Sequence, residues 1–122
     1  MNLDELTDTT LEEIEYLKIE KENIPYCFTY DYGKHIFEFE IRYNEVNDFF
    51  IADLYLLEGI NKIPIVIGEK IMLNQMLFKT KSYLNINLPK LIPYDFSENS
   101  KRAGFDEIDN IYLVVVKDVA IW

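Results

Sequence analysis

The chain has 122 residues and a mass of 14.5 kDa, a length that fits one folded domain and leaves no room for a second independent core. Apolar residues make up 49% of it and aromatic residues 15%, which excludes global disorder. Acidic residues outnumber basic ones by 22 to 12, for a formal charge of −10. Because nucleic acids and anionic membranes attract positive charge, we expect neither as a partner.

The single cysteine, Cys27, cannot form an intramolecular disulfide, so we expect the fold to depend on packing in a reducing compartment. Acidic residues follow Met1 in place of a basic and then an apolar segment, which predicts no signal peptide. The longest apolar run covers only residues 111–116, whereas a membrane span needs about 20 residues.

Residues 1–13 are polar and acidic, and we expect them to form an extension, flexible or a short helix, ahead of one β domain that spans residues 14–122. Thr10 and Glu13 have the spacing of a capping box, which favours a short helix. Residues 16–19 are rich in β-forming side chains, which favours a strand. Periodicity leaves both interpretations open.

From Ile24 onwards the pattern is that of β-strands, and apolar and polar side chains alternate most clearly over residues 37–43. Residues 49–57 are apolar on both faces except at Asp53, which is typical of a central strand. Six or seven strands with at most one short helix predict an all-β fold, a small antiparallel barrel or sandwich. The predicted strands cover residues 26–30, 37–43, 49–57, 63–67, 71–73 and 111–117, with turns at 31–34, 44–48 and 58–62 and a break at 68–70.

Two later segments are less regular. Two prolines interrupt residues 85–93, so we expect an extended segment there, at a sheet edge or as a covering loop. Residues 94–110 are rich in Asp, Asn and Ser, which predicts a long loop that Phe105 and Ile108 hold against the core.

Cys27 and the only histidine, His35, flank a predicted hairpin turn, so a Cys–His pair is conceivable. No third orienting group is evident, and the favoured interpretation is a surface histidine beside a turn and a small buried cysteine. With two Cys or His residues in total, the chain cannot supply the three or four such ligands of a zinc site.

Asp53 interrupts an otherwise apolar strand, and a buried carboxylate needs a hydrogen-bonding or ionic partner. Glu38 and Glu40 on the neighbouring predicted strand could form a carboxylate pair with Asp53 for acid–base chemistry. Arg42 could instead form a structural ion pair with Asp53. The ion pair is favoured, because the alternating pattern turns the two glutamates toward solvent.

The other charged clusters match no known site. Residues 68–70 lack the spacing and the Ser or Thr of a phosphate-binding loop, and Asp106, Glu107 and Asp109 lack the glycine of a calcium loop. We therefore predict no catalytic, metal-binding or cofactor-binding residues, and a protein that is not an enzyme. Basic residues concentrate only at Lys79 with Lys81 and at Lys101 with Arg102.

Nine Tyr, eight Phe and one Trp exceed what a core of this size readily hides, so some aromatic side chains are expected to reach the surface as contact residues. The alternative is that the tyrosines are simply half-buried on strands. A small acidic β protein with surplus aromatic surface is more consistent with a part of an assembly than with a catalyst. The candidates for contact residues are Tyr26, Tyr30, Tyr32, Tyr43, Phe50 and Tyr55.

Short blocks in a fixed order carry a family resemblance: Ile24 to Phe28, Phe37 to Asn44, Asp48 to Tyr55, Gly68 to Leu73, Gln75, Leu77 with Phe78, Leu91 to Pro93, Lys101 with Arg102, Phe105 and Asn110, before a terminal apolar strand. Over residues 14–117 this order resembles the baseplate plug proteins of contractile-tailed phages, prophages and phage tail-like particles. The sequence departs from the family pattern in a long turn at 58–62 and at Gln75 with Met76.

The resemblance implies an opening strand at residues 15–19 and a structural protein of the virion tail baseplate, synthesised and assembled in the cytoplasm of a bacterial host. Such a protein would lie near the tail axis, pack between the tube or hub and the spike, and help to close the lumen before contraction. Its partners would be the hub, tube, spike and other baseplate proteins, and further copies of itself, as a trimer or hexamer around the axis. Copies that each carry −10 would associate in a salt-dependent way.

Two other classes of function stay open. An acidic inhibitory or immunity-type protein would block a basic cleft on its partner, but such a role needs acids spaced along one face. In this chain residues 1–23 hold eight acids against two lysines, so the charge is concentrated at one end. A small hydrolase or lyase would have Asp53 at its centre and would lose turnover in an Asp53→Asn variant.

Overall fold

The computed structural model describes residues 15–78 and 88–116. The predicted helix at Thr10 and Glu13, the extension at residues 1–13 and the basic pair Lys79 and Lys81 lie outside these ranges. The described chain contains seven strands and two short 3-10 helices. In order they are β1 (Tyr16–Lys18), η3 (Lys21–Asn23), β2 (Tyr26–Tyr32), β3 (His35–Asn44), β4 (Phe49–Glu58), β5 (Asn61–Lys70), β6 (Leu91–Tyr94), η4 (Ile108–Asn110) and β7 (Tyr112–Val115).

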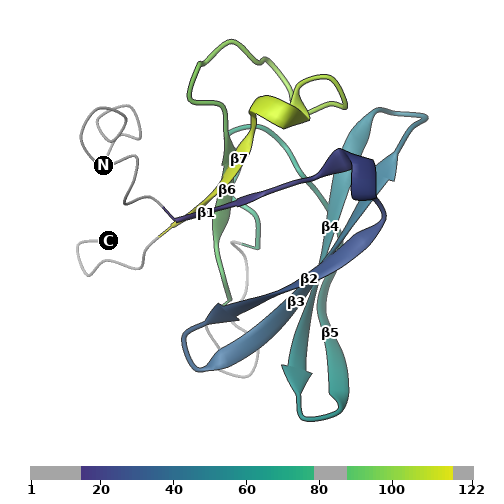
Figure 1. Ribbon diagram of the computed structural model, residues 1–122, viewed down its shortest axis with the longest axis vertical. Helices are drawn as coiled ribbons and strands as arrows, with labels where there is room; N and C mark the ends of the chain where they lie inside the picture. Colours follow the sequence, from purple (N-terminus) through teal and green to yellow (C-terminus); the bar gives the residue numbers. More distant parts are fainter. Residues whose placement is uncertain (1–14, 79–87, 117–122) are drawn as a thin grey trace.

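The strands form two antiparallel sheets that pack against each other as a sandwich (Figure 1). The larger sheet has the order β2-β3-β4-β5 and is built from consecutive hairpins, whereas the smaller one has the order β1-β7-β6. The predicted all-β fold is confirmed, and of the two predicted forms, barrel and sandwich, the described strands form the sandwich. None of the helices in the described part of the chain is long and apolar enough to cross a membrane.

The alternation predicted for residues 37–43 is confirmed in β3. Phe37, Phe39 and Ile41 are almost completely buried, and the residues between them lie on the opposite face of the sheet. β4 lies between β3 and β5, as predicted for a strand that is apolar on both faces. The inward-facing side chains of β3 and β4 therefore form the centre of the core.

Two turns are shorter than the sequence predicted. Asp31 and Tyr32 belong to β2, so a two-residue turn of Gly33 and Lys34 joins β2 to β3. Gly33 has a φ of +65°, the left-handed conformation that hairpin turns of this length favour at their first central residue. The turn predicted over 58–62 also contracts to two residues, because cross-strand pairing continues almost to the tip of the β4–β5 hairpin.

The break predicted at residues 68–70 is wrong, because β5 continues to Lys70. Ala52 pairs with Glu69 and Leu54 with Val66, so β5 has one extra residue opposite Asp53. Glycine occurs both at bulges and at strand ends, so its presence in the sequence does not distinguish the two. In this bulge Gly68 adopts a φ of +79°. The separate strand predicted at 71–73 is absent. Ile71 donates one hydrogen bond to the Phe50 carbonyl at 2.9 Å, directly after the end of β5, and then the chain leaves the sheet.

The smaller sheet joins distant parts of the chain. The opening strand implied by the family resemblance is confirmed as β1, which pairs with β7. β6 is an edge strand, as expected for the proline-containing segment, and the Leu77 N–H bonds to the Leu91 carbonyl at 2.7 Å along that edge. The predicted strand at 111–117 shortens to β7, and its last residue lies outside the described ranges. The loop predicted at 94–110 is confirmed over residues 95–107, because Tyr94 ends β6 and η4 covers Ile108–Asn110. Ile108 is fully buried, whereas Phe105 is 41% exposed and contacts the rings of Tyr43 and Phe50.

Phe39 packs at the centre of an aromatic cluster in the core. Its ring lies 5.1 Å from that of Phe28, 6.2 Å from that of Tyr30 and 5.8 Å from that of Phe78. β2 and β3 thus contact the segment that follows β5 through one side chain. Large buried aromatic residues of this kind supply much of the hydrophobic stabilisation of a small domain.

Replacing Phe39 by alanine is therefore expected to lower the free energy of unfolding by about 3–5 kcal/mol, because the lost contacts leave a cavity. Ile36 on the same strand is 46% exposed, and Ile36→Ala should lower it by less than about 1 kcal/mol. Urea denaturation followed by circular dichroism measures both. Equal losses would show that the Phe39 cluster is not the centre of the core.

Candidate functional site

Asp53 is buried on β4 and forms the predicted ion pair with Arg42. Arg42 Nε donates to Asp53 Oδ2 at 2.8 Å, and Arg42 Nη2 donates to Oδ1 at 2.9 Å. The N–H of Gly68, in the bulge of β5, donates to Oδ1 at 2.6 Å. One carboxylate thus joins β3, β4 and β5 on the outer face of the larger sheet, which explains why an acid interrupts an apolar strand.

The surroundings of Asp53 keep it ionised. Burial opposes ionisation, but the hydrogen bonds from Arg42 and Gly68 outweigh burial and lower the pKa of the carboxyl. The carboxylate pair that the sequence left open does not form: Glu40 lies opposite Asp53 across the strands but contacts the Tyr55 hydroxyl at 3.5 Å, and Glu38 forms an ion pair with Lys62 at 2.5 Å. A general acid needs a raised pKa, and Asp53 has the reverse.

Cys27 and His35 are not brought together. Cys27 pairs with Glu40 and His35 with Tyr32, so the two lie five residues apart along the β2–β3 ladder, roughly 16 Å at 3.3 Å per residue. The prediction of a buried Cys27 is wrong, because alternation along the edge strand β2 turns it outward. Partial burial, and then the nearby glutamates, raise the pKa of its thiol, the reverse of what a nucleophilic cysteine requires.

The aromatic residues predicted to reach the surface divide into two groups. Phe50 is fully buried, because it is on the core face of the central strand β4, and its prediction is wrong. The five tyrosines are half-buried: four pack against the core, and Tyr55 lies on the outer face of the larger sheet beside Glu40 and Lys62. The five are Tyr26, Tyr30, Tyr32, Tyr43 and Tyr55.

A polar cluster around Asp48 ties the β3–β4 hairpin to the long loop. Asp48 Oδ1 accepts hydrogen bonds from the Tyr43 hydroxyl at 2.6 Å and from the Phe105 N–H at 2.9 Å. Arg102 donates to both Asp48 Oδ2 and the Asp48 carbonyl at 2.5 Å. Hydrogen bonds from Tyr43, Phe105 and Arg102 lower the pKa of Asp48 to about 2. Arg102, predicted as part of a basic concentration, is therefore a structural residue.

Lys18 on β1 holds the other side of the same loop. Its Nζ donates to the carbonyls of Ile108, Asp109 and Ile111 at 3.0, 2.5 and 3.2 Å, around the end of η4. A cation at the carbonyl end of a helical turn is stabilising, and burial lowers the pKa of this lysine. Lys21 adds an ion pair to Asp109 at 3.3 Å.

The loop that starts at Asp95 is organised by its own side chain. Asp95 Oδ1 accepts hydrogen bonds from the N–H and hydroxyl of Ser97 at 2.8 and 2.6 Å, and Oδ2 accepts one from the Ser100 N–H at 3.0 Å. Burial opposes ionisation, but the bonds from Ser100 and Ser97 prevail and lower the pKa of Asp95 to about 2. Within residues 15–78 and 88–116 no cluster of three or more Asp, Glu, His or Cys residues is placed to hold a metal ion.

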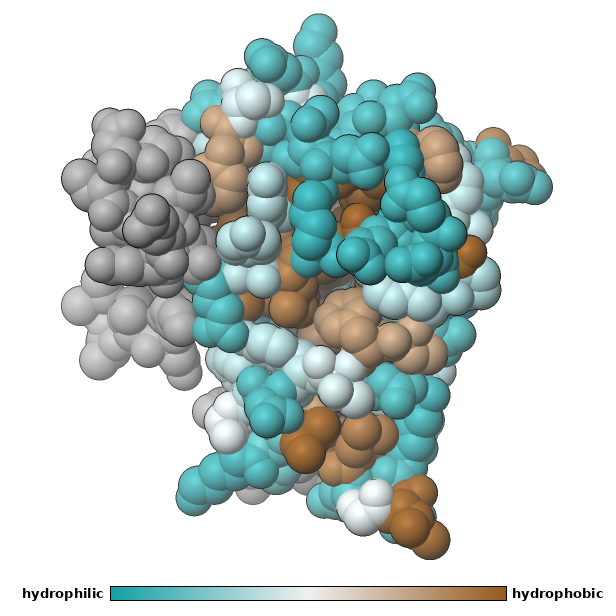
Figure 2. Space-filling view, in the orientation of Figure 1, coloured by the Kyte–Doolittle hydropathy of each residue, from teal (hydrophilic) through white to brown (hydrophobic). Residues whose placement is uncertain are grey.

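Apolar side chains are exposed at separate places on the surface. In Figure 2 the apolar patches lie between hydrophilic areas, and one of them projects at the end where the β4–β5 hairpin turns. Val46 and Ile60, at the tips of the β3–β4 and β4–β5 hairpins, are 87% and 101% exposed. A further aromatic group lies on the outer face of the smaller sheet: Tyr16 contacts Tyr112 at 4.8 Å, and Phe96 contacts Tyr112 at 5.7 Å and Tyr94 at 4.9 Å.

The family described as cyanophage baseplate Pam3 plug gp18 matches residues 14–119. The chain belongs to this baseplate plug family. Neither a search of the curated proteins nor one of the solved structures gives a match. A baseplate protein acts by contact with its neighbours, so the surface groups are the candidate functional residues of this family member, and the ordered polar clusters are the scaffold that positions them.

Most of the exposed groups were not predicted from the sequence. Val46 and Ile60 occupy turns, where apolar residues are uncommon, and that signal could have marked them as contact residues. Tyr16, Tyr94, Phe96 and Tyr112 come from β1, β6, β7 and the loop after β6, and only the strand pairing brings them together.

A side chain at Gly104 is expected to be destabilising. A Cβ there would lie 2.7 Å from Asp48 Oδ2 and 2.8 Å from Glu107 Oε1, closer than real Cβ contacts, and it would also displace Arg102. Because these groups are tied to one another, Gly104→Ala should lower the free energy of unfolding by about 1–3 kcal/mol. In the Arg102→Ala background the loss should shrink in a double-mutant cycle. Strictly additive losses in thermal denaturation would contradict this account.

Asp95 should make stability depend on pH between about 2 and 4. Its folded pKa of about 2 lies below the unfolded value of about 3.9, so its contribution is present above pH 4 and disappears as the pH falls toward 2. In Asp95→Asn the free energy of unfolding should vary less over this range, and Ser97→Ala, which removes one donor, should be intermediate. Urea titrations at pH 2 to 5 test this, and an unchanged slope in Asp95→Asn would refute it.

Proposed function

We propose that this protein is a plug or inner-baseplate protein that lies near the tail axis, packs between the tube or hub and the spike, and helps to close the lumen before contraction. The observation that carries the proposal is the match of the plug family to residues 14–119. The role is one of association and release, and the protein is not an enzyme.

The distribution of exposed groups supports a role between several neighbours. The hairpin tips with Val46 and Ile60 and the aromatic group on the smaller sheet lie on different elements, so more than one partner can be contacted at once. The titratable groups that sequence reasoning considered for catalysis have structural partners or lie apart: Asp53 is bound by Arg42, and Cys27 is distant from His35.

We further propose that copies of the chain form a trimer or hexamer around the axis. Each copy carries a formal charge of −10, so adjacent copies repel at low ionic strength. Hub, tube or spike surfaces with positive charge would offset this repulsion and favour the correct neighbours. We therefore expect copies to associate around the axis when their baseplate partners are present, and less readily as isolated chains.

Tail-sized particles from a lysate of the producing strain test the proposal. We expect the polypeptide to sediment with them and to occur at a few copies per spike when quantified by mass spectrometry against sheath and spike proteins. Copies should dissociate to different extents as the salt concentration of the gradient is changed. A protein that runs free, or that binds one soluble enzyme, would contradict the plug role and favour an acidic inhibitor.

A further inference from the structure

The four sheet edges in the described part of the chain differ in how well they are protected. The β6 edge is covered by hydrogen bonds from Asn74 and Leu77, and β1 has only three residues. β5 carries Pro64, lysines at 62 and 70 and two register shifts, which are the features that prevent edge pairing. β2 has seven residues, no proline, no lysine and an unshifted register with β3. It is thus the long, regular edge.

The backbone of β2 has groups that point away from β3. The two-residue turn makes Tyr32 and His35 a hydrogen-bonded pair, and such pairs alternate along an antiparallel ladder. The N–H and C=O groups of Cys27, Thr29 and Asp31 therefore point to the open edge. The side chains of these three residues are exposed, and none of the hydrogen bonds outside the ladder involves their backbone in residues 15–78 and 88–116.

β1 runs near this edge but does not pair with it. The Tyr26 hydroxyl accepts a hydrogen bond from the Glu20 N–H at 3.1 Å and donates to the Lys18 carbonyl at 3.4 Å, and the Tyr30 hydroxyl bonds to Glu15. These contacts are made by the tips of rings on the inner face. No backbone–backbone hydrogen bond joins β1 to β2, so among residues 15–78 and 88–116 no strand occupies this edge.

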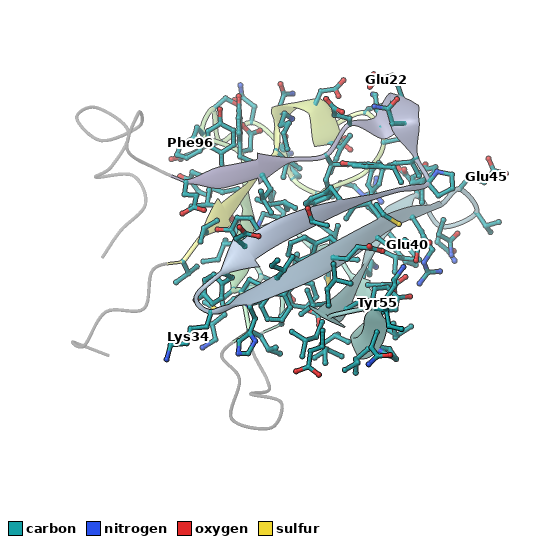
Figure 3. All side chains as sticks on the ribbon, turned by 60° about the horizontal axis from the view of Figure 1, so that its bottom comes forward. Glu22, Lys34, Glu40, Glu45, Tyr55 and Phe96 are labelled. Carbon is teal, nitrogen blue, oxygen red and sulfur yellow. The ribbon has the colours of Figure 1, made fainter. Side chains whose placement is uncertain are left out.

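The two faces beside the edge differ in chemistry. On the inner face four half-buried rings form a row, with Tyr26 and Phe28 stacked at 5.7 Å and Tyr30 and Tyr32 at 6.3 Å. On the outer face the nearest charges are mostly acidic, and Figure 3 shows Glu40 there on the strand next to β2. Glu38 is neutralised by Lys62, but Asp31 and Glu40 form no ion pair within the described residues.

We propose, on the basis of the proposed baseplate function, that β2 receives an extended segment of another baseplate protein in which apolar and basic side chains alternate. Successive residues of an added strand point to opposite faces, so its apolar residues would cover the row of rings and its basic residues would meet Asp31 and Glu40. A second copy of this chain fits the edge less well, because it would bring its own Asp31 and Glu40 to the same face.

Cys27 reports on the edge, since an added strand would cover its thiol. In full-length chains we expect maleimide to label Cys27 about tenfold more slowly in assembled particles than in the free protein, because the side chains of the added strand would lie against the thiol. Ile67 on β5 is 56% exposed, and Ile67→Cys in a Cys27→Ser chain serves as the control, whose labelling rate should change little on assembly. Unchanged labelling of Cys27, or equal protection at both edges, would overturn the proposal.

Substitutions separate strand addition from other contacts. Thr29→Pro removes an outward N–H that the β2–β3 ladder does not use, whereas Thr29→Val keeps it. We expect particles to contain about tenfold less of the proline variant, provided that circular dichroism shows it folded. If the proline variant does not fold, the incorporation of Asp31→Lys is compared with that of Glu58→Lys. The second variant makes the same charge change at an exposed site on β4. Equal incorporation of Asp31→Lys and Glu58→Lys would refute a basic partner.

The outcomes also separate this inference from the function on which it rests. A wild-type chain that is absent from the particles contradicts the plug role itself. A wild-type chain that is present, together with edge variants that incorporate normally, contradicts only the strand addition. If the free wild-type protein dimerises in sedimentation equilibrium and Thr29→Pro is a monomer, the occupant of the edge is a second copy, and the proposed partner is wrong.

Discussion

No strand of one sheet pairs with a strand of the other among the described residues, so side chains determine how the two sheets pack. At the centre the contacts are hydrophobic and non-directional, with Phe39 in the midst of three other rings. At one end they are directional, because Asp48 and Lys18 bind backbone and side-chain groups of the same long loop from opposite sides. The first kind of contact supplies stability, and the second fixes the position of one sheet relative to the other.

Three aspartates of this strongly acidic protein have structural roles. Asp48, Asp53 and Asp95 each accept three or more hydrogen bonds and hold a hairpin, a bulge or a loop in place. Carboxylates in such positions are kept ionised and are poor proton donors. What the fold presents to its surroundings is instead apolar hairpin tips, aromatic rings and a strand edge, which suits a member of a family of baseplate proteins.

Local sequence patterns predicted the parts of the fold that depend on local rules. Alternation identified β3, the apolar run identified β4, and the isolated acid in that run led to its arginine partner. The pattern could not tell that Gly68 forms a bulge rather than a strand end, because either use exploits the same backbone freedom. The exposure of Cys27 and the aromatic group around Tyr112 depend on which strands lie at an edge and which pair, and that is decided by contacts between distant segments.

The pairing of β1 with β7 links Tyr16 to Val114, nearly the full length of the described chain. Contacts between residues so distant in sequence require a large loop to close before they are gained, which slows folding. On the ribosome, β1 would wait without a strand partner until β7 had been synthesised. The aromatic group that spans the two strands does not exist before that moment, so a truncated polypeptide could build its hairpins and still lack this surface. Completion of the fold and completion of this aromatic surface would then be the same event.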